Sequence, residues 1–292
     1  MFFRFGKHTI KWGVGYFWSP ADVLNLSVID AEDPTADREG PVSLKAHLPF
    51  DLNNLYLYVI TNSDIKPLET ALAPKLEMVY GNTEYSIAGY YQRALSPRGI
   101  FTFTSSIRDL DLFGEGVVTY GSDRIFVRES RKSIENFPDP PEDLNIVLDT
   151  FEIGSALLFS GTIGLRYLKD IDQRNMARNP GSIAVIGQYF YNGEGYTSSR
   201  LLKPAIFLQQ NPEYNGLAKD AAEQPESYIA PPNLTFGDIT PWGQHYGALT
   251  LNWSNIFNSD VSVSLLGLGN LSDLSFIISP TLSFKLLDTF NV

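Results

Sequence analysis

The chain has 292 residues, no cysteine and a formal net charge of −11 at pH 7. The negative charge argues against nucleic acid as a partner, because phosphate groups would be repelled. The absence of cysteine excludes a disulfide framework and a thiolate zinc site, and three histidines argue against a histidine-rich metal site. We therefore expect neither a metal nor a cofactor.

The hydropathy of the chain excludes membrane-spanning helices but allows membrane-spanning strands. Mean hydropathy is −0.09, and no uninterrupted apolar run approaches the roughly 18 residues of a spanning helix. In a membrane β-barrel only alternate residues face lipid, so mean hydropathy stays near that of a soluble protein. No stretch resembles a linker, and we expect a single domain over residues 1–292.

The first predicted element is a strand over 3–12. The opening MFFRFGKHTIKWG has no apolar core and no small-residue cleavage site, so it does not match a secretory signal. A mature start and a reading frame that has lost its beginning are the two alternatives that these residues leave open.

A structured loop is predicted next, near 14–41. In GYFWSPADVLN, Ser19 can cap a helix with Pro20 at its first position, which predicts a short helix over about 20–25 at the rim or folded inward. The following acidic run DAEDPTADREG would admit a calcium site. Its spacing fits no EF-hand, so a solvated loop is the favoured interpretation.

Alternation with a period of two predicts strands over most of the remaining chain. In 42–50 the even-numbered residues are apolar and share one face, whereas the other face includes Lys45 and His47. A turn at DLNN joins this strand to a second one over 55–61 as a hairpin. The same pattern predicts strands at about 75–81, 84–92, 100–108, 110–120, 154–169, 182–192, 245–257, 261–269 and 274–287. With 3–12 this gives about twelve strands, each near the length that a tilted membrane strand needs or somewhat longer.

Aromatic side chains gather near the ends of several predicted strands and in the collar before Ser19. An amphipathic ring is most stable at the depth of the lipid headgroups, so these positions are typical of an interfacial girdle. The candidate interfacial aromatics are Trp12, Tyr16, Phe17, Trp18, Tyr167, Tyr189, Tyr191 and Trp253. A soluble sandwich also has alternating strands, so periodicity alone does not separate the two architectures.

The lengths of the connections favour a barrel. Long polar connections near 14–41, 62–74, 121–153 and 193–243 all follow odd-numbered strands. This parity is expected when long loops lie at one rim and tight turns at the other. The sequence therefore predicts an all-β fold, an antiparallel transmembrane β-barrel with about twelve strands visible.

Two stretches carry a resemblance to a known family. WGVGYFWSPADVLN, followed by the Asp-Pro of DPTADREG and the strand VSLKAHLPF, resembles the amino-terminal region of poorly characterised porin-like outer-membrane β-barrel proteins of diderm bacteria, and YFYNGEGYT resembles a late segment of theirs. The resemblance implies a membrane barrel and carries over no catalytic residue. The final LSFKLLDTFNV departs from that pattern because it interrupts the alternation and ends without a terminal aromatic, so a truncated larger barrel is a further expectation.

The polar strand faces would line the lumen of such a barrel. Charges of both signs there would order water and favour small polar solutes, whereas a lumen packed with ion pairs and without flow is the alternative. The candidate pore-lining residues are Lys45, His47, Glu115, Arg166 and Gln188, with Glu194 at a rim. We expect Glu115 to be the nearest partner of Arg166.

The expected function is an outer-membrane, porin-like channel for passive passage of small polar solutes or ions, with the lipid bilayer as its partner and the bacterial outer membrane as its location. The alternative is a soluble or surface β-sandwich that binds a protein or glycan through the 193–243 loop. Neither Gly-x-Ser-x-Gly nor His-Glu-x-x-His occurs, so we do not expect an enzyme. A barrel-embedded lipid hydrolase is a third hypothesis, for which the sequence offers no candidate triad.

Overall fold

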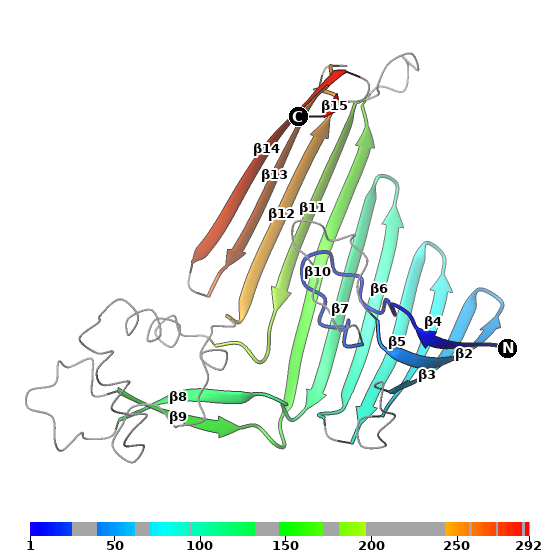
Figure 1. Ribbon diagram of the computed structural model, residues 1–292, viewed down its shortest axis with the longest axis vertical. Helices are drawn as coiled ribbons and strands as arrows, with labels where there is room; N and C mark the ends of the chain where they lie inside the picture. The colour runs from blue at the N-terminus through cyan, green and yellow to red at the C-terminus, as the bar shows by residue number, and fades with distance from the viewer. Residues whose placement is uncertain are drawn as a thin grey trace, which may run out of the picture.

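The chain forms one long antiparallel sheet and a separate two-stranded hairpin in the computed structural model (Figure 1). The structure describes residues 1–24, 40–61, 70–93, 95–131, 146–171, 181–196, 243–256, 259–272, 274–287 and 290–291. The large sheet has thirteen strands in the order β1-β2-β3-β4-β5-β6-β7-β10-β11-β12-β13-β14-β15, and β8 pairs with β9 alone. Within these residues no helix is long and apolar enough to cross a membrane.

The strands of the large sheet follow the chain order with one insertion, the β8–β9 hairpin. The strands are β1 (Phe2–Lys7), β2 (Val42–Phe50), β3 (Asn53–Thr61), β4 (Ala71–Tyr80), β5 (Thr83–Gln92), β6 (Arg98–Ile107), β7 (Leu110–Tyr120), β8 (Ile125–Arg131), β9 (Ile146–Glu152), β10 (Leu157–Asp170), β11 (Ser182–Tyr191), β12 (His245–Ser254), β13 (Val261–Asn270), β14 (Ser275–Leu287) and β15 (Phe290–Asn291).

The twelve predicted strands correspond to β1–β7 and β10–β14, so the predicted all-β antiparallel sheet is confirmed. The hairpin of β8 and β9 was not predicted, because the sequence over 121–153 was assigned to a long connection. β1 and β15 stand at the two ends of the strand order, so the described sheet is open. Closure into a barrel therefore stays a prediction.

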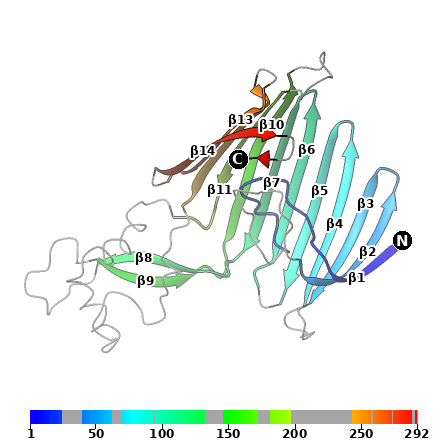
Figure 2. The same ribbon diagram turned by 45° about the horizontal axis from the view of Figure 1, so that its top comes forward.

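The pairing register is unbroken from β1 to β14, and it sorts the side chains of all these strands onto two continuous faces. Residues directly opposite each other in an antiparallel pair point to the same side. We call the side that carries Lys45, Glu115 and Arg166 the inner face, and the opposite side the outer face. Figures 1 and 2 show the segment 8–24, in dark blue, lying against the inner face.

Tight turns gather at one end of the sheet. Two-residue turns join β2 to β3, β4 to β5 and β6 to β7, and the first residue of each has a positive φ: 53° at Asp51, 61° at Gly81 and 59° at Arg108. The connections that follow β1, β3, β7 and β11 leave from the other end, where the β8–β9 hairpin projects (Figure 1). The arrangement agrees with the predicted parity of connection lengths except at 171–181, a longer connection between β10 and β11 at the end with the tight turns.

Candidate functional site

The inner face brings the predicted pore-lining residues onto one surface. Register places Lys45 and His47 on β2, Glu115 on β7, Arg166 on β10 and Gln188 on β11 on this side of the sheet. Glu194 lies in the turn after β11, at the end of the sheet with the long connections. The alternation in the sequence was therefore sufficient to assign the face of every strand residue in this set.

The segment 8–24 packs its apolar side chains onto the inner face. Trp12 is only 2% exposed, and its ring lies edge-on to that of Tyr58 on β3, with 5.9 Å between centroids. Beneath the segment, β4 and β5 contribute three buried alanines to the contact. The buried cluster consists of Ile10, Trp12, Ala21 and Leu24 from the segment and Tyr58, Ala71, Ala73, Ala88, Tyr90, Ile100 and Val117 from the strands.

The side-chain amide of Gln188 holds the aromatic collar of this segment. Its Oε1 accepts hydrogen bonds from the backbone N–H groups of Tyr16 and Phe17, both at 2.9 Å. Its Nε2 donates to the carbonyl oxygen of Trp18 at 2.6 Å and to Oγ1 of Thr162 at 2.7 Å. Gln188 is 5% exposed, so it satisfies three backbone groups of the segment away from water, where leaving them unpaired would be costly.

Glu115 on β7, two strands from Gln188 on β11, anchors the same segment. Its Oε2 accepts a hydrogen bond of 2.8 Å from the backbone N–H of Val14, and the side chain is 5% exposed. A Cβ atom at Gly13 would lie 1.6 Å from Oγ of Ser19 and 2.8 Å from Oε2 of Glu115, and one at Gly15 would lie 2.0 Å from the carbonyl oxygen of Trp18. The segment can therefore adopt this path only with glycine at both positions.

Two aromatic clusters complete the contact between segment and sheet. The ring of Trp18 stacks on Phe190 of β11 at an interplanar angle of 15° with 6.0 Å between centroids, and it contacts Tyr246 of β12 at 5.5 Å. The ring of Tyr16 lies edge-on to Phe113 of β7 at 5.2 Å. These contacts extend the binding of the segment from β3 to β12.

The expected interfacial role of the first four aromatics is therefore corrected. Trp12, Tyr16, Phe17 and Trp18 pack on the inner face and not on the outer face, where a lipid belt would lie. They belong to a connection, so alternation does not fix the direction of their side chains, and Gln188 and Glu115 turn the segment inward.

The predicted helix over 20–25 is also wrong within the described residues. The segment makes a turn there, in which the N–H of Asp22 donates to the carbonyl oxygen of Ser19 at 3.0 Å, and Ala21 and Leu24 are buried against the sheet. The burial of these two side chains outweighs a single helical turn, which is marginal in isolation. The acidic run considered for calcium lies almost entirely in 25–39, outside the described residues.

Arg166 has a different partner from the one predicted. Its Nε lies 3.8 Å from Oδ2 of Asp111, which stands directly opposite on β7, and its Nη1 donates to the hydroxyl of Tyr16 at 3.1 Å. The register instead places Glu115 opposite Thr162, four residues along β10 from Arg166. The pairing of β7 with β10 and the face of Arg166 were predicted, whereas the identity of its partner depended on the register of the two strands.

A second group of charges lies on the inner face beyond the segment. Nζ of Lys45 lies 4.5 Å from the ring centroid of Tyr56, and Nζ of Lys75 pairs with Oε1 of Glu77 at 2.8 Å. Nε2 of His47 lies 2.8 Å from Oδ1 of Asn54. Charges of both signs thus line the inner face.

The remaining four aromatic candidates lie on the outer face. Tyr167, Tyr189, Tyr191 and Trp253 alternate with inner-face residues on β10, β11 and β12. Aromatic residues also end several other strands on this face. Strand-end aromatics of the outer face are Phe50, Tyr80, Tyr91, Tyr120, Tyr191 and Trp253.

Sequence reasoning placed Gln188 on the correct face but did not predict that it binds the segment 8–24, and it missed Gly13 and Gly15. The sequence Gly-Val-Gly directly after Trp12 was the available signal that the backbone of the segment passes close to other atoms. Among the described residues, no three His, Asp or Glu side chains are grouped to hold a metal ion.

Comparisons with protein-family models, with curated proteins and with solved structures returned no match. We therefore infer the function from the two faces of the sheet and from the contacts of the segment.

Proposed function

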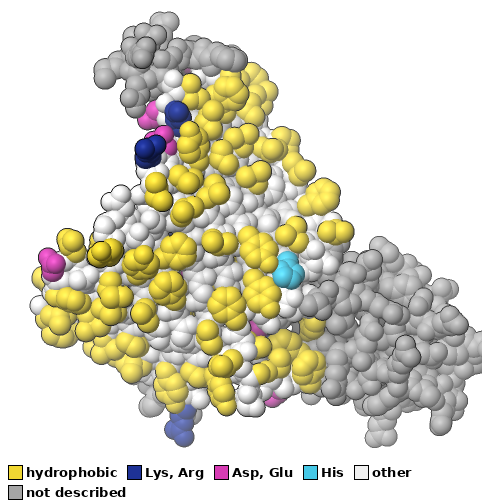
Figure 3. Space-filling model, turned by 180° about the vertical axis from the view of Figure 1, so that it is seen from behind, with side chains coloured by type: hydrophobic (Ala, Val, Ile, Leu, Met, Phe, Trp, Pro, Cys, Tyr) yellow, Lys and Arg dark blue, Asp and Glu magenta, His cyan; other side chains and the backbone are white. Residues whose placement is uncertain are grey.

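We propose that this protein is a porin-like channel of the bacterial outer membrane through which small polar solutes or ions pass. The observation that carries the proposal is the inverted polarity of the sheet. The outer face is apolar and is not covered by any of the described residues, and the inner face bears the charges and the folded segment (Figure 3 shows the outer face).

The distribution of charge between the two faces is strongly unequal. From Val42 to Phe284, the described strand positions on the outer face of the large sheet include one lysine, Lys169 near the end of β10, and no arginine, aspartate or glutamate. The inner face of the same strands carries Lys45, Lys75, Glu77, Glu84, Arg98, Asp111, Glu115, Arg166 and Asp170.

The apolar residues of the outer face are exposed along the whole width of the sheet. Leu57 on β3 is 41% exposed, Ile87 on β5 53%, Ile163 on β10 59% and Ile278 on β14 60%. Soluble monomers rarely expose a contiguous apolar patch larger than a few hundred Å². Lipid chains would cover such a surface, and the strand-end aromatics would then lie at headgroup depth.

The inner face supports a narrow, polar conduit. The segment 8–24 lies across β3 to β12 and is fixed by Gln188 and Glu115, so it would narrow the interior without moving freely. Arg166 with Asp111 and Lys75 with Glu77 supply fixed charges of both signs. Rings of fixed charge and pore diameter are the features that set selectivity in channels.

A soluble β-sandwich is less well supported by the same observation. Such a fold would pack the apolar face against a second sheet. The second sheet within the described residues consists of β8 and β9 alone, which form a projecting hairpin (Figure 1). The proposed binding loop over 193–243 lies mostly outside the described residues, so that alternative gains no support from the fold.

Conductance in planar lipid bilayers tests the proposal. The protein is refolded in detergent, added to the bilayer and recorded in a gradient of potassium chloride. Stepwise increases in current are expected, with larger steps for Gln188→Leu because the narrowing segment loses its anchor. Glu84→Gln, an inner-face change that leaves the segment's hydrogen bonds intact, is the control. Protein that inserts but gives no steps would contradict the channel, and protein that stays monomeric in buffer without detergent would contradict membrane insertion.

A further inference from the structure

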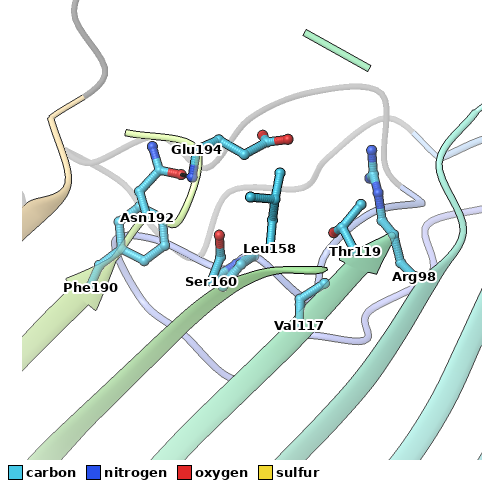
Figure 4. Close-up of a pocket in the computed structure, with 9 residues that line it drawn as sticks. Arg98, Val117, Thr119, Leu158, Ser160, Phe190, Asn192 and Glu194 are labelled. Carbon is cyan, nitrogen blue, oxygen red and sulfur yellow. Dashed lines mark hydrogen bonds between the residues drawn. The ribbon is translucent and has the colours of Figure 1, made fainter. Parts of the chain in front are cut away.

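A small pocket lies on the inner face at the end of the sheet from which the long connections leave (Figure 4). Its walls come from inner-face positions at the ends of β6, β7, β10 and β11 and from Pro20 of the segment 8–24. Its volume is about 180 Å³, whereas pockets for drug-sized ligands begin at roughly 300 Å³. The pocket therefore suits a solute of few heavy atoms.

Groups of opposite charge stand on opposite sides of this pocket. Figure 4 shows the carboxylate of Glu194 over Leu158 on one side and the guanidinium of Arg98 beside Thr119 on the other. The two groups do not form an ion pair with each other within 4.0 Å. A ligand that bridges them needs a cationic and an anionic end.

Both charged groups are held in place before any ligand arrives. Nη2 of Arg98 donates to Oδ2 of Asp123 at 3.0 Å, and Oδ1 of the same carboxylate accepts the N–H of Ser96 at 2.7 Å. On the other side, Oε1 of Glu194 accepts the hydroxyl of Ser122 at 2.5 Å. Groups fixed in this way lose little conformational freedom on binding, which favours affinity for a small ligand.

The space between the charges has both apolar and hydroxyl surface. Val117 and Leu158 contribute aliphatic side chains, whereas Thr119 and Ser160 contribute hydroxyls. Oγ of Ser160 accepts the N–H of Gly193 at 3.1 Å, so its own proton can be donated to a ligand. A ligand with two charged ends and a short aliphatic part matches this lining.

We propose that the pocket is a binding site for a small zwitterion of the α-amino-acid class, with the ammonium group at Glu194 and the carboxylate at Arg98. A simple amine would bind at Glu194 alone and a simple carboxylate at Arg98 alone, beside its existing partner Asp123, whereas a zwitterion contacts both groups. The assignment of the ligand depends only on the pocket. A role of the pocket in selecting solutes for passage rests on the proposed channel.

Calorimetry on the detergent-refolded protein tests the assignment with three probes of similar shape. The probes are L-valine, isobutylamine, which lacks the carboxylate, and isovalerate, which lacks the amine. We expect L-valine to bind at least about tenfold more tightly than either analogue, because each analogue loses one charge-assisted interaction with the pocket. Equal affinity for the three probes, or no binding of L-valine, would overturn the assignment.

Two substitutions identify which group binds which end. Arg98→Gln should weaken L-valine about tenfold and leave isobutylamine unchanged, and Glu194→Gln should weaken L-valine about tenfold and leave isovalerate unchanged. Arg98→Lys keeps the positive charge and should weaken L-valine less than Arg98→Gln does. Glu84→Gln, on the same face but outside the pocket and not bonded to the segment, is the matched control and should not change any of the three affinities. Melting of each variant in detergent shows whether it folds like the parent.

The outcomes for pocket and channel are separable. Binding of L-valine by a protein that gives no conductance would contradict the channel and support the pocket. Conductance without preferential binding of L-valine would contradict the pocket alone. Weakening of all three probes to the same extent by Arg98→Gln and Glu194→Gln would show that the variants act through the fold, and it would overturn the assignment of the two ends.

Discussion

The inner and outer faces of the same strands differ in what covers them. The inner face binds the segment 8–24 through Gln188, Glu115 and an apolar cluster around Trp12, whereas the outer face carries apolar side chains that the described chain leaves bare. Within the described residues, the chain covers only one of the two faces. The chemistry of the uncovered face, apolar with aromatic strand ends, matches lipid.

Polar groups also play different parts on the two faces. On the inner face, buried polar side chains bind the backbone of a connection, as Gln188 does for Tyr16, Phe17 and Trp18. On the outer face, the side chains carry almost no charge, and the backbone groups of the strands are paired within the sheet. The substitutions below either remove this difference between the two faces or measure its size.

The largest effect is expected from a charge on the outer face. Ile163→Arg places a guanidinium near the middle of β10, and in a bilayer this should cost roughly 2–4 kcal/mol of folding free energy. Thr250→Arg, in the middle of β12 on the inner face, is the matched control and should cost clearly less. Urea unfolding in lipid vesicles measures both. Equal costs for the two variants would contradict the assignment of the faces.

Loss of the amide that anchors the segment should have the next largest effect. Gln188→Leu leaves the N–H groups of Tyr16 and Phe17 without their acceptor, at about 1–3 kcal/mol for each group that stays buried. Gln188→Glu keeps an acceptor for these groups but loses the two donated hydrogen bonds, so it should fall between Leu and the parent. Hydrogen exchange of residues 12–18 is the measurement. Unchanged protection in Gln188→Leu would show that the amide does not hold the segment.

A methyl group at the close approach between segment and sheet should have a smaller effect. Gly13→Ala drives a Cβ to 1.6 Å from Oγ of Ser19, so the segment must shift, at about 1–3 kcal/mol. Gly99→Ala is the control, because no atom lies within 4 Å of a Cβ there, and its effect should stay within about 0.5 kcal/mol. Thermal melting in detergent compares the two variants. A Gly13→Ala protein as stable as Gly99→Ala would contradict the packing of the segment.

The smallest effect on stability, but a change in selectivity, is expected from Arg166→Ala. The ion pair with Asp111 spans 3.8 Å and its side chains are more than one-third exposed, so its loss should cost less than about 1 kcal/mol. Removal of this positive charge should shift the reversal potential in a salt gradient towards cation selectivity. An unchanged reversal potential in a folded variant would show that Arg166 does not face the conducting path.

Much of the fold could be predicted because the sheet obeys a two-residue period. Alternation in 42–50 assigned each residue to its face, and the turn predicted at DLNN marked the boundary between β2 and β3. The β8–β9 hairpin escaped prediction because β8 includes Arg128, Glu129 and Arg131, which break the apolar alternation.

The candidate site was less predictable because it depends on contacts across the chain. Gln188 binds the N–H of Tyr16 over a separation of 172 positions, and a strand residue gives no local sign of a partner so distant. The partner of Arg166 depended on the register, since a shift along β7 decides between Asp111 and Glu115. Trp12 and Trp18 lie in a connection, where no period fixes the direction of a side chain.

Tryptophan quenching by brominated lipids tests the central claim most directly, because the two faces carry tryptophans of their own. One variant keeps only Trp253 on the outer face and a second keeps only Trp18 on the inner face, with the other tryptophans replaced by phenylalanine. In vesicles brominated close to the headgroups, Trp253 should be strongly quenched and Trp18 should keep its fluorescence. Equal quenching of both, or no quenching of Trp253, would contradict an outer face in contact with lipid.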